Sequence, residues 1–146
     1  MGEVSHSAVV KAPRETVFAY VNDYQNVPDY FFGISKFRPV TDQTEGLGAV
    51  FDTAIKIGPK ELKSQTKCTE WVENELISLE SVSGLSSATR WSFSDGDEEG
   101  TTKLDVVFRY SLPGGLAGKI LSPLMGPFAD QAVKHTEKVV REKTEG

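Results

Sequence analysis

The order of the predicted elements constrains the fold of this chain more than any other feature. A strand comes first, a short helical stretch follows, then comes a long run of strands only, and one long helix ends the sequence. A sheet followed by a single terminal helix has to bury the apolar stripe of that helix against its own face. The order therefore predicts an α+β fold in which a curved antiparallel sheet wraps around the C-terminal helix. If the sheet curls, a cavity can remain between the two layers.

The strands are predicted from alternating apolar and polar residues and from the turn signals between them. A short helix or an irregular aromatic loop is predicted over Tyr24–Phe32, between the first two strands. About seven strands are expected, at Val4–Lys11, Ile34–Thr41, Val50–Ile57, Glu61–Trp71, Leu76–Val82, Ala88–Ser94 and Thr101–Ser111.

Proline residues mark the starts of both helical regions. The first helix is predicted to open at Ala12-Pro13, because proline lacks the N–H that has no partner in a first turn, and to end near Asn22. The terminal helix is predicted as a short piece over 116–121, a kink, and a main piece that ends near Glu142. Its apolar stripe recurs at steps of three and four residues: Leu121, Leu124, Met125, Phe128, Ala132, Thr136 and Val139.

Composition excludes several classes of protein. A net charge of −5 lacks the basic surface of a nucleic-acid binder. Cys68 is the only cysteine, so the chain cannot form an intramolecular disulfide, and no apolar run is long enough for a membrane helix. Neither His6 nor His135 has a second histidine or a cysteine at metal-binding spacing, and we expect no metal site and no cofactor. We expect a cytoplasmic protein with at most transient membrane contact.

Three local motifs resemble the START-like superfamily, whose architecture is called the helix-grip fold. They are Val10–Phe18, Trp91-Ser92-Phe93 and Gly100–Leu104, and the order of elements matches over nearly the whole chain. Within the superfamily the chain looks most like the polyketide cyclase/dehydrase and lipid transport group. The resemblance implies a START-like domain over residues 1–146. Members of this group range from carriers of hydrophobic ligands to aromatase/cyclases, so the resemblance implies a function within that range.

The candidate ligand-binding residues are those that face across the predicted cavity. From the residues alone, an ordinary filled core explains them as well as a lined hollow, and the resemblance to helix-grip proteins favours the hollow. These candidates are Phe51, Ile55, Trp91, Phe93, Val106, Phe108, Tyr110, Met125, Phe128 and Ala132.

The preferred function is binding or transport of a hydrophobic small molecule, such as a lipid, a polyketide or an isoprenoid. A cyclase/aromatase or dehydratase acting in the same cavity is the first alternative, with Tyr110 and His135 as the best available acid–base pair. A module that delivers a ligand to an unidentified protein partner is the second. Ligand access is expected through Tyr24–Gly33 or through Pro113–Pro127, where glycine and proline lower the cost of opening.

Overall fold

The computed structural model describes residues 2–31, 33–57, 59–84, 86–111, 127, 130–131 and 134–145. Its strands are β1 (Gly2–Val10), β2 (Ile34–Pro39), β3 (Val50–Ile57), β4 (Lys60–Val72), β5 (Leu76–Gly84), β6 (Ser86–Asp95) and β7 (Thr102–Ser111). Between β1 and β2 lie the α-helix α1 (Arg14–Asn22), the 3-10 helix η1 (Tyr24–Asn26) and the short helix α2 (Val27–Tyr30). Residues 127, 130–131 and 134–144 are helical and belong to the C-terminal helix.

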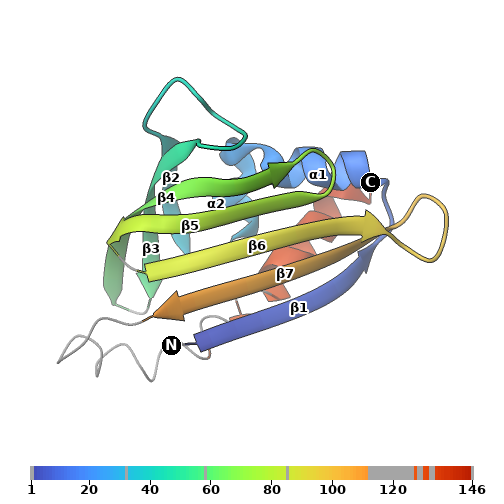
Figure 1. Ribbon diagram of the computed structural model, residues 1–146. Coiled ribbons are helices and arrows are strands. Elements are labelled where there is room, and N and C mark those ends of the chain that lie inside the picture. The colour runs from blue at the N-terminus through green and yellow to red at the C-terminus, as the bar shows by residue number, and fades with distance from the viewer. Residues whose placement is uncertain are drawn as a thin grey trace.

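The seven strands form one antiparallel sheet in the order β1-β7-β6-β5-β4-β3-β2. Strands β1 and β2 are consecutive in sequence but lie at opposite edges, so the helices that connect them have to cross one face of the sheet. Figure 1 shows α1, α2 and the C-terminal helix on this same face, inside the curve of the strands. The predicted helix-grip architecture is thereby confirmed.

Most predicted boundaries differ from the observed ones by a few residues, and the serine-rich strand ends differ for a clear reason. Strand β5 continues to Gly84 and β6 already begins at Ser86, although Ser83, Ser86 and Ser87 give no apolar alternation. Main-chain pairing extends these strands, since Ser87 lies opposite Tyr110 of β7. A strand that is held by backbone hydrogen bonds at its end leaves little trace in a hydropathy pattern.

The first helix starts one residue later than its proline suggests. Pro13 has an extended backbone (φ −63°, ψ 153°) and is the N-cap of α1, not its first helical residue. Its carbonyl oxygen accepts hydrogen bonds from the backbone N–H groups of Thr16 and Val17, at 3.0 and 3.1 Å. Proline therefore fixes the direction of the chain as it enters the helix.

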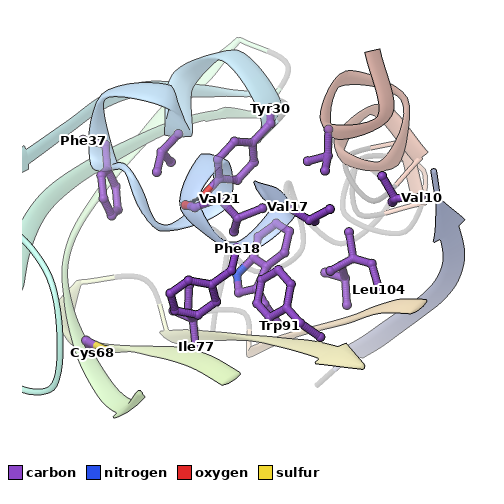
Figure 2. Close-up of a cluster of buried hydrophobic side chains, with 14 of the residues drawn as sticks. Val10, Val17, Phe18, Val21, Tyr30, Phe37, Cys68, Ile77, Trp91 and Leu104 are labelled. Carbon is purple, nitrogen blue, oxygen red and sulfur yellow. Dashed lines mark hydrogen bonds between the residues drawn. The ribbon is translucent and has the colours of Figure 1, made fainter. Parts of the chain in front are cut away.

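The core is centred where α1 crosses the sheet. Figure 2 shows Phe18 and Tyr30 reaching from the helical side toward Trp91 on the sheet. Phe18 packs edge-on against Phe93, with ring centroids 5.2 Å apart, and Tyr30 packs edge-on against Trp91 at 5.3 Å. Edge-to-face aromatic pairs add to the stabilisation that comes from burial itself.

The C-terminal helix is attached to β1 and to the residue that follows this strand. Glu137 contacts the His6 ring of β1, and the Glu145 carboxylate accepts a hydrogen bond of 2.9 Å from the Lys11 backbone N–H. Val140 is fully buried in the core.

In the part of the chain that the structure describes, no helix is long and apolar enough to cross a membrane.

A buried hydroxyl links the last strand to the start of α1, and its removal gives a first prediction. Thr102 is 0% exposed and its hydroxyl donates a 2.7 Å hydrogen bond to the Ala12 carbonyl. We expect Thr102→Val to lower the free energy of unfolding by about 1–3 kcal/mol, because the Ala12 carbonyl loses a buried partner. Urea denaturation measures the change. Thr16→Val, at an exposed position of α1, is the control and should change stability far less; equal effects would contradict the assignment.

Candidate functional site

Two small hollows lie between the helices and the inner face of the sheet, each with a volume of about 30 Å³. The aromatic hollow is bordered on one side by Phe51, Cys68 and Trp71, and the hydroxyl hollow by Thr53, Thr66 and Thr89. A volume of this size holds a group about as large as a water molecule. Five residues line both hollows and separate them: Val27, Tyr30, Phe37, Leu79 and Trp91.

The outer rim of the aromatic hollow is closed by three side chains from separate parts of the fold. The Trp71 indole N–H donates to Asn22 Oδ1 at 2.9 Å, and Asn22 Nδ2 donates to Glu45 Oε2 at 2.8 Å. Glu45 belongs to the loop 40–49 between β2 and β3, where Gly48 adopts φ +92° and donates its N–H to the Cys68 carbonyl. A positive φ is strained for residues with a side chain, so glycine allows this loop to fold back over the rim.

The hydroxyl hollow has polar groups on a surface that is otherwise made of aromatic and aliphatic side chains. The Thr53 hydroxyl on β3 and the Thr66 hydroxyl on β4 are hydrogen-bonded to each other at 3.1 Å, and both residues are buried. Thr89 and Ser87 line the same hollow from β6. Three strands, β3, β4 and β6, therefore contribute hydroxyl-bearing residues to this hollow.

Most of the groups that line the two hollows carry no charge at neutral pH. Burial raises the pKa of the Tyr30 phenol, whose hydroxyl donates a 2.8 Å hydrogen bond to the Val21 carbonyl. Burial likewise raises the pKa of the Cys68 thiol, which donates to the Glu70 carbonyl. Among the described lining residues, Glu45 at the rim is the one with a charged side chain. Within the described ranges, no group of three His, Cys, Asp or Glu side chains is arranged to hold a metal ion.

The ligand-binding residues predicted from sequence divide into three groups. Phe51 lines the aromatic hollow, Ile55 and Phe108 line the hydroxyl hollow, and Trp91 lines both. Three others line neither hollow: Phe93 and Val106 are buried in the core, and Tyr110 is half-buried with its ring 5.9 Å from that of Phe108. The predicted helix residues Met125, Phe128 and Ala132 lie outside the described residues.

The structure places the predicted acid–base pair away from the linings of both hollows. His135 Nε2 lies 3.2 Å from the Asp29 carbonyl oxygen, and Tyr110 lies at the end of β7 beside Gly2. A catalytic role for these two residues stays a prediction. Of the two access segments, Tyr24–Gly33 is described except for residue 32, whereas 113–127 lies outside the described residues except for residue 127.

The buried hydroxyls were not among the predicted site residues, although a signal for them exists in the sequence. Thr53 alternates in phase with Phe51 and Ile55, and Thr89 alternates in phase with Trp91. In-phase alternation turns these threonines to the inner face as surely as it turns the aromatic residues.

The thiol of Cys68 gives a prediction about pH. Because burial raises its pKa in the folded protein, the unfolded chain releases this proton first, above the ordinary thiol pKa of about 8.5. The stabilising contribution is complete below that pH and is lost as the pH rises toward the folded pKa. We expect Cys68→Ala to flatten the fall in stability at alkaline pH, as measured by urea denaturation at several pH values. An unchanged slope would mean that the thiol is not shielded.

Comparisons with known proteins assign the whole fold to one family. The family model described as polyketide cyclase/dehydrase and lipid transport matches residues 1–141. No curated protein sequence gives a significant match.

Solved structures agree over nearly the full length of the chain. A protein from Thermus thermophilus is 18% identical with a TM-score of 0.81, covering 98% of this chain and 97% of its own. A START superfamily protein from Mycobacterium smegmatis is 19% identical with a TM-score of 0.74, covering 98% and 97%. The Zhui aromatase/cyclase from Streptomyces sp. R1128 is 14% identical with a TM-score of 0.78, covering 99% and 93%. At these identities the likeness shows a shared fold.

Proposed function

The chain belongs to the polyketide cyclase/dehydrase and lipid transport family, and on this premise we propose that it binds a hydrophobic small molecule between the sheet and the helices. The observation that carries the proposal is the pair of hollows on the inner face, separated by the side chains of five shared residues. Aromatic residues with a few polar groups are the usual lining of a small-molecule site.

Binding of a whole ligand requires the two hollows to merge. Sites that enclose drug-sized molecules have volumes of about 300–1,000 Å³, far above the 30 Å³ of each hollow. Two of the dividing side chains, Phe37 on β2 and Leu79 on β5, come from different strands. A change of their rotamers would connect the two hollows along the inner face without moving the strands. Burial of roughly 300 Å² of apolar ligand surface contributes about 7 kcal/mol, from which the cost of this rearrangement is subtracted.

Phe31 gives a route by which a ligand reaches this space. It is half-buried at the end of α2, and its ring packs edge-on against Phe108 at 5.8 Å, on the wall of the hydroxyl hollow. A swing of this ring opens the hollow to solvent and leaves the sheet unchanged. The segment Tyr24–Gly33 is therefore the access route that we propose.

Catalysis as a cyclase or dehydratase is the second candidate, favoured by the family description and by the fold shared with an aromatase/cyclase. General acid–base catalysis requires a group that ionises near the working pH. Tyr30 and Cys68 both line the aromatic hollow, and burial raises the pKa of each side chain further above neutral pH. This observation supports a binding protein more than an enzyme.

The same proposal covers the domain organisation, the cellular location and the binding partners of the protein. Residues 1–146 act as a single START-like domain, located in the cytoplasm, where a lone buried cysteine such as Cys68 stays reduced. Its partner is the hydrophobic ligand, without nucleic acid and with at most transient membrane contact during exchange.

Native mass spectrometry of freshly purified protein, combined with titration of the neutral dye Nile red, tests the function. We expect a co-purifying hydrophobic compound, or dye binding that Ala49→Leu weakens at least several-fold, because Ala49 is fully buried and lines the aromatic hollow. Ala19→Leu makes the same change at an exposed position of α1 and should leave dye binding unchanged. Absence of both a bound compound and dye binding would refute the proposal.

A further inference from the structure

We propose that Thr53, Thr66 and Thr89 form a neutral hydrogen-bonding subsite, which selects a hydrophobic ligand that carries uncharged hydroxyl or carbonyl oxygens. The inference rests on the proposed function, because it names the class of ligand for the same inner face. The alternative within that function is an anionic ligand such as a fatty acid, for which the site would have to supply a cation.

The threonine pair supplies one half of the subsite. Thr53 and Thr66 come from neighbouring strands, and their hydroxyl oxygens are 3.1 Å apart. Each hydroxyl has one proton and two lone pairs, so a single bond between them uses only one of the two protons. The pair therefore keeps a donor and several acceptor positions for a ligand oxygen, on two residues that are themselves buried.

Thr89 supplies the other half. It lies on β6, two strands from β4, and its register position is level with Cys68, two residues along the strand from Thr66, so the two threonines are about 12 Å apart at ordinary strand spacing and rise. The residue is only 7% exposed and lines the hydroxyl hollow, and its hydroxyl forms no hydrogen bond within the described part of the chain. A ligand oxygen that bonds to this hydroxyl therefore meets no competing partner among the described residues.

The charges around the hollows argue against an anion. No lysine or arginine occurs among the described residues that line either hollow, and the charged lining residue among them, Glu45, is acidic. A buried carboxylate or phosphate without a cation loses its hydration and gains no ion pair. Hydroxyl groups about two strands apart suit a ligand that carries neutral oxygens on both sides of an apolar body.

Three naphthalene probes that share one ring system and one substitution pattern test the subsite in the full-length protein. They are 2,6-dihydroxynaphthalene, which is neutral and polar, 2,6-dimethylnaphthalene, which is neutral and apolar, and 2,6-naphthalenedicarboxylate, which is anionic at neutral pH. Quenching of the fluorescence of Trp91 and Trp71 reports binding, because both side chains line the aromatic hollow next to the subsite. We expect the diol to bind more tightly than the dicarboxylate.

Two variants remove the hydroxyls with little change of shape. Thr53→Val with Thr66→Val replaces both members of one hydrogen bond, a change that is close to neutral for stability. This double variant and Thr89→Val should each weaken diol binding about two- to tenfold and leave dimethylnaphthalene binding unchanged. Thr89→Ser should restore diol binding. Thr69→Val is the matched control, since Thr69 is on β4 but lines neither hollow.

The outcomes separate the subsite from the function on which it rests. If dimethylnaphthalene binds but the valine variants leave diol affinity unchanged, the subsite is wrong and the proposed function stands. Tightest binding of the dicarboxylate would also overturn the subsite. If none of the three probes binds, the subsite is wrong, and the proposed function is decided separately by the co-purifying compound and the Nile red titration.

Discussion

Substitution of Trp91 by alanine is expected to lower the free energy of unfolding by about 3–5 kcal/mol, the range for removal of a large aromatic side chain from a core. Trp91 is 2% exposed, lines both hollows and packs edge-on against Tyr30. Since domains are usually stable by about 5–15 kcal/mol, such a loss leaves the variant close to its unfolding threshold. Urea denaturation, followed by circular dichroism, measures the effect.

Trp91 is also expected to matter for the binding of the hydrophobic probes. Its removal merges the two hollows, so a variant that remains folded should bind Nile red faster than the natural protein does. Trp91→Phe keeps a ring beside Tyr30 and should cost clearly less stability. Leu47→Ala, at a residue that is 63% exposed, is the control and should have almost no effect. A loss below about 1 kcal/mol for Trp91→Ala would show that this side chain is not central to the core.

The fold was predictable because each level of the sequence points to the same architecture. Trp91 and Phe93 on β6 alternate with polar residues, and Leu104, Val106 and Phe108 on β7 alternate in the same way with residues of the outer face. Such alternation is enough to assign one face of each strand to the core. The serine-rich ends of β5 and β6 were less predictable, because backbone pairing with no apolar face holds them in place.

The site was less predictable, since alternation gives the face of a residue and not its neighbour across the layer. Phe93 and Trp91 share a face, yet Phe93 packs against Phe18 of α1, whereas Trp91 lines both hollows. The difference depends on where α1 crosses the sheet, which is a property of the whole chain. The Thr53–Thr66 pair was missed for another reason: a buried threonine suggests a filled core until its partner on the next strand is known.

Release of α2 from its two hydrogen-bonded neighbours is the other change with a large expected effect. The Tyr30 hydroxyl donates to the Val21 carbonyl of α1, and the Tyr30 carbonyl accepts from the Thr136 hydroxyl of the C-terminal helix, both at 2.8 Å. Tyr30→Phe combined with Thr136→Val removes both donors and keeps the packing of the rings. We expect a loss of about 2–4 kcal/mol, because two buried carbonyls lose their partners. Both hydrogen bonds involve Tyr30, so the effects of the two substitutions on stability need not be additive.

The local signature distinguishes this double variant from a general loss of stability. Hydrogen exchange should become faster first at the Phe31 amide, whose N–H donates to the Val27 carbonyl at 2.9 Å, and only later in β6 and β7. Association of Nile red should accelerate if Tyr24–Gly33 is the access route. Exchange that rises uniformly over helices and strands, with unchanged dye association, would count against both the hydrogen-bonded attachment and the route.

The Tyr30 phenol adds a dependence on pH with a definite sign. Burial is the main cause that raises its pKa, and Tyr20 and the Asp23 carboxylate raise it further. The unfolded chain therefore ionises first, near pH 10, so the stabilisation from the neutral phenol is complete below that pH and is lost as the pH rises above it. Tyr30→Phe alone should be less stable than the natural protein at neutral pH but should lose less stability between neutral and strongly alkaline pH. Thr136→Val leaves the phenol in place, so it should lose as much stability at alkaline pH as the natural protein does. If the stability of the two single variants falls equally with pH, the Tyr30 hydroxyl is not shielded from water.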